Sequence, residues 1–229
     1  RLEPFFSEIA GQWSTIWLRA GSKNHEIEHA IIKNSTIGIL MDSIGSTTEP
    51  TLKISNTQIY NTSSFGLLGR TANIEGKNLV IANNGQSSLG CTIGGTYNFT
   101  HATFGNFWNS SIRDLPTVLI NNFITFTNVD NTQSTLARDL KAANFINCII
   151  EGNQNIEFFI EKAEGTEFQY HFRNSLLKFD DPNGRFSNNP LFDFENTNYY
   201  ENNVFNGFAD FKNTAMNELV IGQKSDAVN

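Results

Sequence analysis

The chain has 229 residues with 39% hydrophobic and 17% charged side chains, which is enough to build one core. It carries 16 basic against 23 acidic residues, a net charge of -7 that disfavours nucleic acid as a partner because phosphate-binding surfaces gather Lys and Arg. No apolar run reaches the roughly 18 residues of a membrane span, so we expect no transmembrane segment in this chain.

The first residues lack the charged and apolar regions of a signal peptide, and the chain begins at Arg1 and not at Met. We therefore expect a processed or trimmed piece of a longer protein, with any export signal or lipid anchor lying outside this sequence. Residues 1–229 are expected to form a single domain whose last part, about 179–229, is irregular.

The first predicted strand alternates around Trp13, Ile16 and Leu18, and a turn at 21–24 leads to a second strand from Ile27. From there a short pattern recurs: apolar, gap, apolar, gap, Asn or His, and an apolar residue three positions later. It first appears complete at Leu52, Ile54, Asn56 and Ile59, and returns 22 and then 23 residues later. Repeats of this length bury little alone and must stack on one another.

The residues around each repeat are Ile, Val, Thr, Phe and Tyr in alternation, which is typical of strands. Stacked strands would place equivalent residues in columns. We expect a polar ladder at one corner, with Asn121 as a weaker step within it: His29, Asn56, Asn78, His101, Asn147 and Asn174. We expect an inward apolar column three residues further along: Ile32, Ile59, Ile81, Phe104, Ile124, Ile150 and Leu177.

Two stretches interrupt the rhythm, 106–116 and 130–139, and we interpret both as loops inserted between coils, where solenoids often carry their binding residues. Cys91 and Cys148 lack paired spacing and metal-ligand partners, so we expect two buried apolar side chains and no zinc. His29 and His101 occupy ladder positions, where a corner hydrogen-bonding role is expected and metal binding is not.

The segments Gly11-Gln12-Trp13, Gly21-Ser22-Lys23-Asn24 and Ile27 to Ile39 resemble secreted bacterial proteins of the right-handed parallel β-helix repeat family. Asn189-Pro190-Leu191-Phe192-Asp193 and Ser225-Asp226-Ala227 are similar to the segments that close such domains, with Asn189 in place of the usual Asp. The resemblance implies an all-β, right-handed parallel β-helix of about seven to nine coils with inserted loops. It also implies export, to the outer-membrane surface or the medium.

Three functions fit these observations. The first is a non-catalytic cell-surface module that binds glycan or scaffolds a complex of envelope proteins, without cofactor or metal. Its binding residues would be aromatic, because flat rings stack on sugar faces and anchor protein contacts. We select Trp17, Trp108, Tyr199 and Tyr200.

The second function is an uronate-specific polysaccharide lyase, which needs a cation against the uronate carboxylate and a base for the sugar proton. Its candidates are Arg138, Arg173, Lys178 and Glu151, with Lys141, Glu157 and Glu161 as secondary ones. We expect calcium as a cofactor only if the chain is such a lyase. The third function is an accessory subunit of an outer-membrane protein assembly. No Ser-His-Asp arrangement or glycosidase motif is present.

Overall fold

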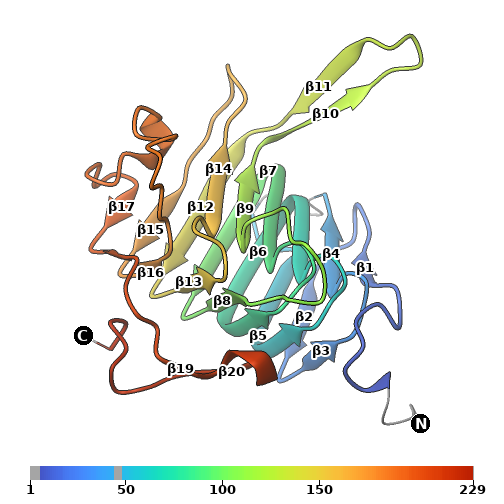
Figure 1. Cartoon of the computed structure of the whole chain (residues 1–229). Helices are drawn as coiled ribbons and strands as arrows, with labels where there is room; N and C mark the ends of the chain where they lie inside the picture. The colour runs from blue at the N-terminus through green and yellow to red at the C-terminus, as the bar shows by residue number, and fades with distance from the viewer. Residues whose placement is uncertain (1–5, 44–47, 229) are drawn as a thin grey trace.

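The structure is a computed structural model, and it describes residues 6–43 and 48–228. The regular secondary structure is nearly all β-strand, and the chain coils like a solenoid, so that the strands of the large sheet pair in parallel with strands of the next coil. Within the described residues, sixteen strands join in one large sheet that curls around the core (Figure 1).

The register divides the sheet into three walls, each made of one short strand or strand segment from every coil. The first wall contains β1 (Ile16–Leu18), β4 (Ile39–Asp42), the starts of β6 (Leu67–Ala82) and β7 (Leu89–Thr100), β9 (Val118–Asn121) and β14 (Phe158–Glu161). The second wall contains β2 (His25–Glu28), the start of β5 (Leu52–Tyr60), later parts of β6 and β7, β12 (Leu140–Ile146), β15 (His171–Arg173) and β17 (Tyr200–Glu201).

The third wall contains β3 (Ile31–Lys33), the ends of β5 and β6, β8 (Thr103–Asn106), β13 (Ile149–Gly152), β16 (Leu176–Leu177) and β18 (Val204–Phe205). Two antiparallel pairs lie outside the walls: β10 (Phe123–Thr127) with β11 (Gln133–Ala137), and β19 (Phe211–Asn213) with β20 (Glu218–Ile221). Short 3-10 turns occur at η2 (Pro190–Phe192) and η3 (Thr214–Met216).

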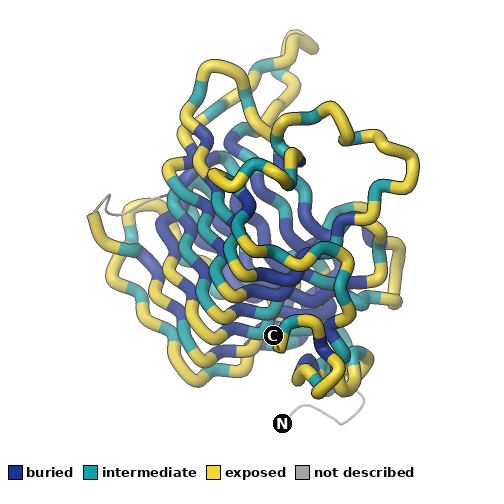
Figure 2. The backbone as a smooth tube through the Cα atoms, turned by 90° about the vertical axis from the view of Figure 1, so that its left-hand side faces the viewer, coloured by how far each residue is buried: buried dark blue, intermediate teal, exposed yellow. Residues whose placement is uncertain are grey.

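Inward-facing side chains form continuous columns, because alternate residues of each strand point into the coil. One column runs Ile32, Ile59, Ile81, Phe104, Ile150 and Leu177. Ile124 is absent from it, since Phe104 pairs directly with Ile150 and Ile124 lies in β10, 46% exposed. Buried residues therefore line the inside of the coils, and many exposed residues lie at their outer turns (Figure 2).

The corner between the second and third walls holds His29, Asn56, Asn78, His101, Asn147, Asn174 and Asn202, all with φ between 48° and 54°. Asn tolerates this left-handed conformation better than most residues, which accounts for its recurrence. The side chains are exposed, and Asn78 Nδ2 donates to Asn56 Oδ1 at 2.7 Å. Asn121 is outside this corner: it ends β9 in the first wall, opposite Glu161.

A buried polar corner, absent from the sequence-based expectations, connects the third wall to the next coil's first wall. Thr62 Oγ1 donates to Asn84 Oδ1 at 2.8 Å, and Asn106 Nδ2 donates to the Asn84 carbonyl at 2.9 Å. Asn106 Oδ1 accepts from the Asn84 backbone N–H at 3.1 Å. The three side chains are buried, so their amide and hydroxyl groups satisfy one another and the bending backbone.

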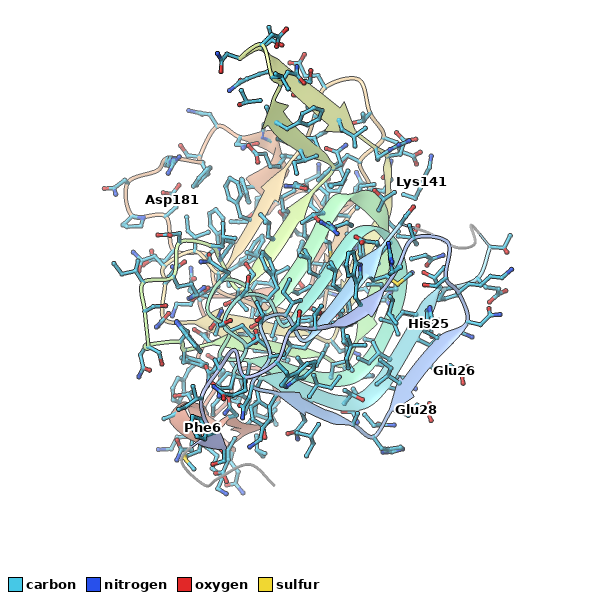
Figure 3. All side chains as sticks on the ribbon, turned by 90° about the vertical axis from the view of Figure 1, so that its right-hand side faces the viewer. Phe6, His25, Glu26, Glu28, Lys141 and Asp181 are labelled. Atoms are coloured by element: carbon cyan, nitrogen blue, oxygen red, sulfur yellow. The ribbon has the colours of Figure 1, made fainter. Side chains whose placement is uncertain are left out.

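The two ends of the coil stack differ. At the C-terminal end, the irregular stretch after β16 folds back, and Phe192 covers Phe179 and Phe158 with ring centroids 4.8 Å and 6.3 Å apart. At the N-terminal end, β1, β2 and β3 pair only with the following coil within the described residues. Residues Glu26 and Glu28 of β2 point away from the coil there (Figure 3).

Candidate binding groove

The floor of a groove is the outer face of the third wall, where Glu151 and Lys178 occupy equivalent positions in adjacent coils. Lys178 Nζ lies 2.9 Å from Glu151 Oε1 and donates to the Gly152 carbonyl at 2.6 Å. Both side chains are largely covered, with 29% of Lys178 and 13% of Glu151 exposed. The ammonium is thus held and balanced by a neighbouring carboxylate.

One side of the groove is the inserted loop between β8 and β9, which begins at Phe107. Arg113 fastens this loop, because its guanidinium lies 2.6 Å from Glu157 Oε1 and also donates to the carbonyls of Asn106 and Leu115. The ion pair is buried, with 2% of Arg113 and 0% of Glu157 exposed. Glu157 also accepts from Thr117 Oγ1 at 2.7 Å, so its charge is well solvated by protein donors.

The other side is the C-terminal segment 206–221, which crosses the third wall from outside (Figure 1). Ala209 packs on Ile149 and Leu176. Leu219 lies against Gly105, where an added Cβ would come 2.5 Å from Leu219 Cδ1. Asn83 Nδ2 anchors the segment by donating to the Thr214 carbonyl at 2.8 Å.

The groove has a volume of about 700 Å³. The groove is lined by three aromatic rings, Phe107, Phe208 and Phe211, and by more acidic than basic side chains. Its charged residues are Glu151, Asp180 and Asp210 against Lys178. Rings bind flat apolar surfaces and carboxylates accept hydrogen bonds from hydroxyl groups, while the surplus negative charge repels anions.

Trp108 lies beside this groove, in the same inserted loop. It lines a neighbouring hollow of about 470 Å³ with Phe107, Tyr60 and Met216, and its indole N–H donates to Ser111 Oγ at 2.9 Å. Trp17 lies elsewhere, on the first wall, 49% exposed. Its indole N–H donates to Asp42 Oδ2 at 2.6 Å, and burial of Asp42 is outweighed by hydrogen bonds from Arg70 and Trp17 that lower its pKa.

Tyr200, one of the four aromatic residues selected from the sequence, is a core residue. It is 3% exposed and stacks on Phe172 with centroids 5.7 Å apart, because it ends an inward column. Burial raises the pKa of its phenol well above the ordinary value. Tyr199 stacks on Tyr170 at 4.5 Å in the same C-terminal cap.

The residues selected for a lyase do not gather in one place. Lys178 and Glu151 meet in the groove, whereas Arg173 lies on the outside of the second wall and Arg138 follows β11. The secondary candidates also scatter: Lys141 pairs with Asp139 and Glu167 on the surface, Glu157 is buried in the ion pair with Arg113, and Glu161 ends β14 in the first wall.

The two cysteines have the character of inert, buried thiols. Cys91 and Cys148 are free and buried, and burial raises the pKa of the Cys148 thiol to about 12. In the portion of the chain that the structure describes, no three His, Cys, Asp or Glu side chains are placed to hold a metal ion.

Phe107, Phe208, Phe211, Asp210 and Arg113 escaped the sequence reasoning. Four of them lie outside the strands and Phe211 begins the short strand β19, and none occupies a position of the coil repeat, so no spacing marks them. The one sequence feature that pointed to any of them is the interruption of the repeat at 106–116, which contains Phe107 and Arg113.

Comparison of the chain with protein-family models, curated proteins and solved structures finds no match. Residues 6–43 and 48–228 include no helix with the length and apolar character that crossing a membrane requires.

Proposed function

We propose that the chain is a right-handed parallel β-helix that acts as a non-catalytic binding module, exported and held at the cell surface. The coiled parallel register and the resemblance of its first and last segments to secreted β-helix proteins support this. The ligand is a glycan, and its site is the groove between the inserted loop and the C-terminal segment.

The groove chemistry favours a neutral glycan. This is the observation on which the proposal depends: Phe107, Phe208 and Phe211 line a space that also contains three carboxylates and one lysine. Sugar rings stack on aromatic faces, and sugar hydroxyls donate to carboxylates. An uronate chain would bring further negative charge against Glu151, Asp180 and Asp210, which disfavours it.

Catalysis is disfavoured by the state of the one lysine in the groove. The Lys178 ammonium makes an ion pair and a backbone hydrogen bond, so it is not poised as a free base. The lyase alternative retains one point in its favour, the adjacency of Lys178 and Glu151 in a groove. The remaining alternatives, a scaffold for envelope proteins and a subunit of an outer-membrane assembly, would use other surfaces.

The proposal predicts measurable binding to at least one neutral polysaccharide, such as dextran, galactomannan or xyloglucan, and none to polygalacturonate. Affinity electrophoresis or calorimetry measures both. Replacing the 60%-exposed Phe208 with Ala should weaken binding about two- to tenfold, the loss expected for one stacked ring. The matched control is Ile112→Ala, which truncates an 85%-exposed apolar side chain in the inserted loop outside the groove.

Two results would reject the proposal. One is the absence of binding to every neutral polysaccharide tested. The other is the release of unsaturated products from polygalacturonate or alginate, followed by ultraviolet absorbance with and without calcium, which would establish the lyase alternative instead.

A further inference from the structure

The groove has a second hollow beside it along the coil axis. Outward positions of the third wall form a row with one residue from each coil: Tyr60, Ala82, Gly105 and Glu151. Glu151 lines the groove, and Tyr60 lines the neighbouring hollow together with Trp108, the Trp108 hollow. Neighbouring strands lie about 4.8 Å apart, so three steps of this row cover roughly 14 Å. The two spaces therefore follow one another on the same wall.

A ridge of two rings separates the groove from the Trp108 hollow. Phe107 and Phe211 meet edge-on with centroids 6.1 Å apart, and Phe107 lines both spaces. The ridge can lie close to the wall because Gly105 has no side chain: an added Cβ would come 3.5 Å from the Phe107 ring. Asn83 joins the two sides of the ridge, since it accepts from the Phe107 N–H and donates to the Thr214 carbonyl, both at 2.8 Å. A chain-like ligand that crosses the ridge would enter both spaces.

The Trp108 hollow is aromatic and polar but carries no surplus charge. Besides Trp108 and Tyr60, its lining includes amide and hydroxyl side chains: Asn61, Asn83, Asn109, Asn217 and Ser110. Amide groups both donate to hydroxyls and accept from them. Among the described residues that line it, Glu8 alone is charged, and Glu8 pairs with Lys33 at 2.9 Å. Rings and amides without surplus charge suit a neutral sugar, as the groove does.

Trp108 is held in position by the inserted loop. Its indole N–H donates to Ser111 Oγ at 2.9 Å, and its backbone carbonyl accepts from Asn153 Nδ2 at 3.0 Å. Asn153 Oδ1 accepts in turn from Arg113, the residue that fastens this loop. A side chain that is already fixed loses little conformational freedom when a ligand binds. A sugar stacked on Trp108 should therefore add measurably to affinity.

We propose that one neutral glycan chain occupies the groove and the Trp108 hollow together, lying along the coil axis and crossing the ridge. This inference rests on the proposed function and adds a length requirement to it. The ligand is a polymer bound along its length, because a short sugar fills only one of the two spaces. Phe208 contacts the part of the chain in the groove, and Trp108 contacts the part beyond the ridge.

Calorimetry with a size series of oligosaccharides, prepared from the neutral polysaccharide that binds, tests this. Affinity should rise with length from the disaccharide until the chain reaches across the ridge, and then level off. Trp108→Ala should weaken binding of the long oligosaccharides about two- to tenfold, the loss expected for one stacked ring. It should leave the disaccharide, which occupies the larger groove, unchanged. Phe208→Ala should weaken both. The matched control, Trp17→Ala, removes the same ring from the first wall and should weaken neither.

Three results would overturn the inference. The first is equal affinity for the disaccharide and the longest oligosaccharide. The second is an equal loss for both in Trp108→Ala, which would mean that Trp108 only shapes the loop beside the groove. The third is unchanged affinity of Trp108→Ala for long oligosaccharides. In each case a neutral glycan still binds, so the proposed function stands, whereas the absence of any binding would reject both.

Discussion

Replacing Glu157 with Gln should lower the free energy of unfolding by about 3 to 5 kcal/mol, as expected when a buried ion pair loses one partner. The Arg113 guanidinium, 2% exposed, would keep its charge in the protein interior without the carboxylate that balances it. The amide would also lose one of the acceptors for Thr117 Oγ1 and the Thr117 and Gln154 backbone N–H groups. Urea denaturation followed by circular dichroism measures the change.

The matched control is Glu161→Gln, four residues further along, where the side chain is exposed and the change should stay within about 0.5 kcal/mol. Loss of the pair should also release the inserted loop, so proteases should cut within 107–117 faster in Glu157→Gln than in the control. Equal stability of the two variants would mean that Arg113 does not fasten the loop. The ion pair would then not explain how this loop forms one side of the groove.

Phe145→Ala is expected to cost about 3 to 5 kcal/mol, the usual range for removing a buried aromatic ring. Phe145 is 0% exposed and lies between Phe99 and Phe172, its equivalents in the adjacent coils, with centroid distances of 5.5 Å and 4.9 Å. It also meets Phe104 edge-on at 5.9 Å. Thermal and urea unfolding would measure the loss.

Phe208→Ala provides the comparison, because it removes the same ring from a site that is 60% exposed and should alter stability little. A cost below about 1 kcal/mol for Phe145→Ala would contradict close packing between neighbouring coils.

The repeat spacing predicts much of the fold because one coil returns the chain to the same place after about two dozen residues. The corner positions of Asn and His could be recognised in the sequence for a physical reason. A sharp corner needs the left-handed backbone conformation, and among residue types only Gly adopts it more readily than Asn. Asn56, Asn78 and His101 illustrate this, each with φ near 50°.

The same local pattern led to the wrong placement of Asn121 and Ile124. Strand alternation has a period of two in a hairpin as well as in a coil. The sequence of β10 therefore looks like one more repeat, although β10 lies outside the large sheet. Pairing of Phe104 with Ile150, across 46 positions, bypasses the β10–β11 hairpin entirely. Only the three-dimensional register separates an inserted hairpin from a coil.

The groove could not be predicted from spacing because its sides come from irregular segments. Phe107 and Phe208 are brought to the same face by two attachments distant in the sequence. One is the Arg113–Glu157 pair, 44 positions apart, and the other is the Asn83–Thr214 contact, 131 positions apart. Lys178 and Glu151 were predictable as outward residues, and their contact follows from the repeat.

The central claim is that residues one coil apart pack directly on each other, and a double-mutant cycle on Gly76 and Phe99 tests it most directly. These residues are paired in adjacent coils, and a Cβ on Gly76 would lie 2.5 Å from Phe99 Cδ1. Gly76→Ala should therefore cost about 1 to 3 kcal/mol by overpacking. Phe99→Leu alone should cost up to about 1.5 kcal/mol. If the coils stack, the double variant should be more stable than the sum of the single changes predicts, by at least about 0.5 kcal/mol. Strictly additive costs would contradict the stacking.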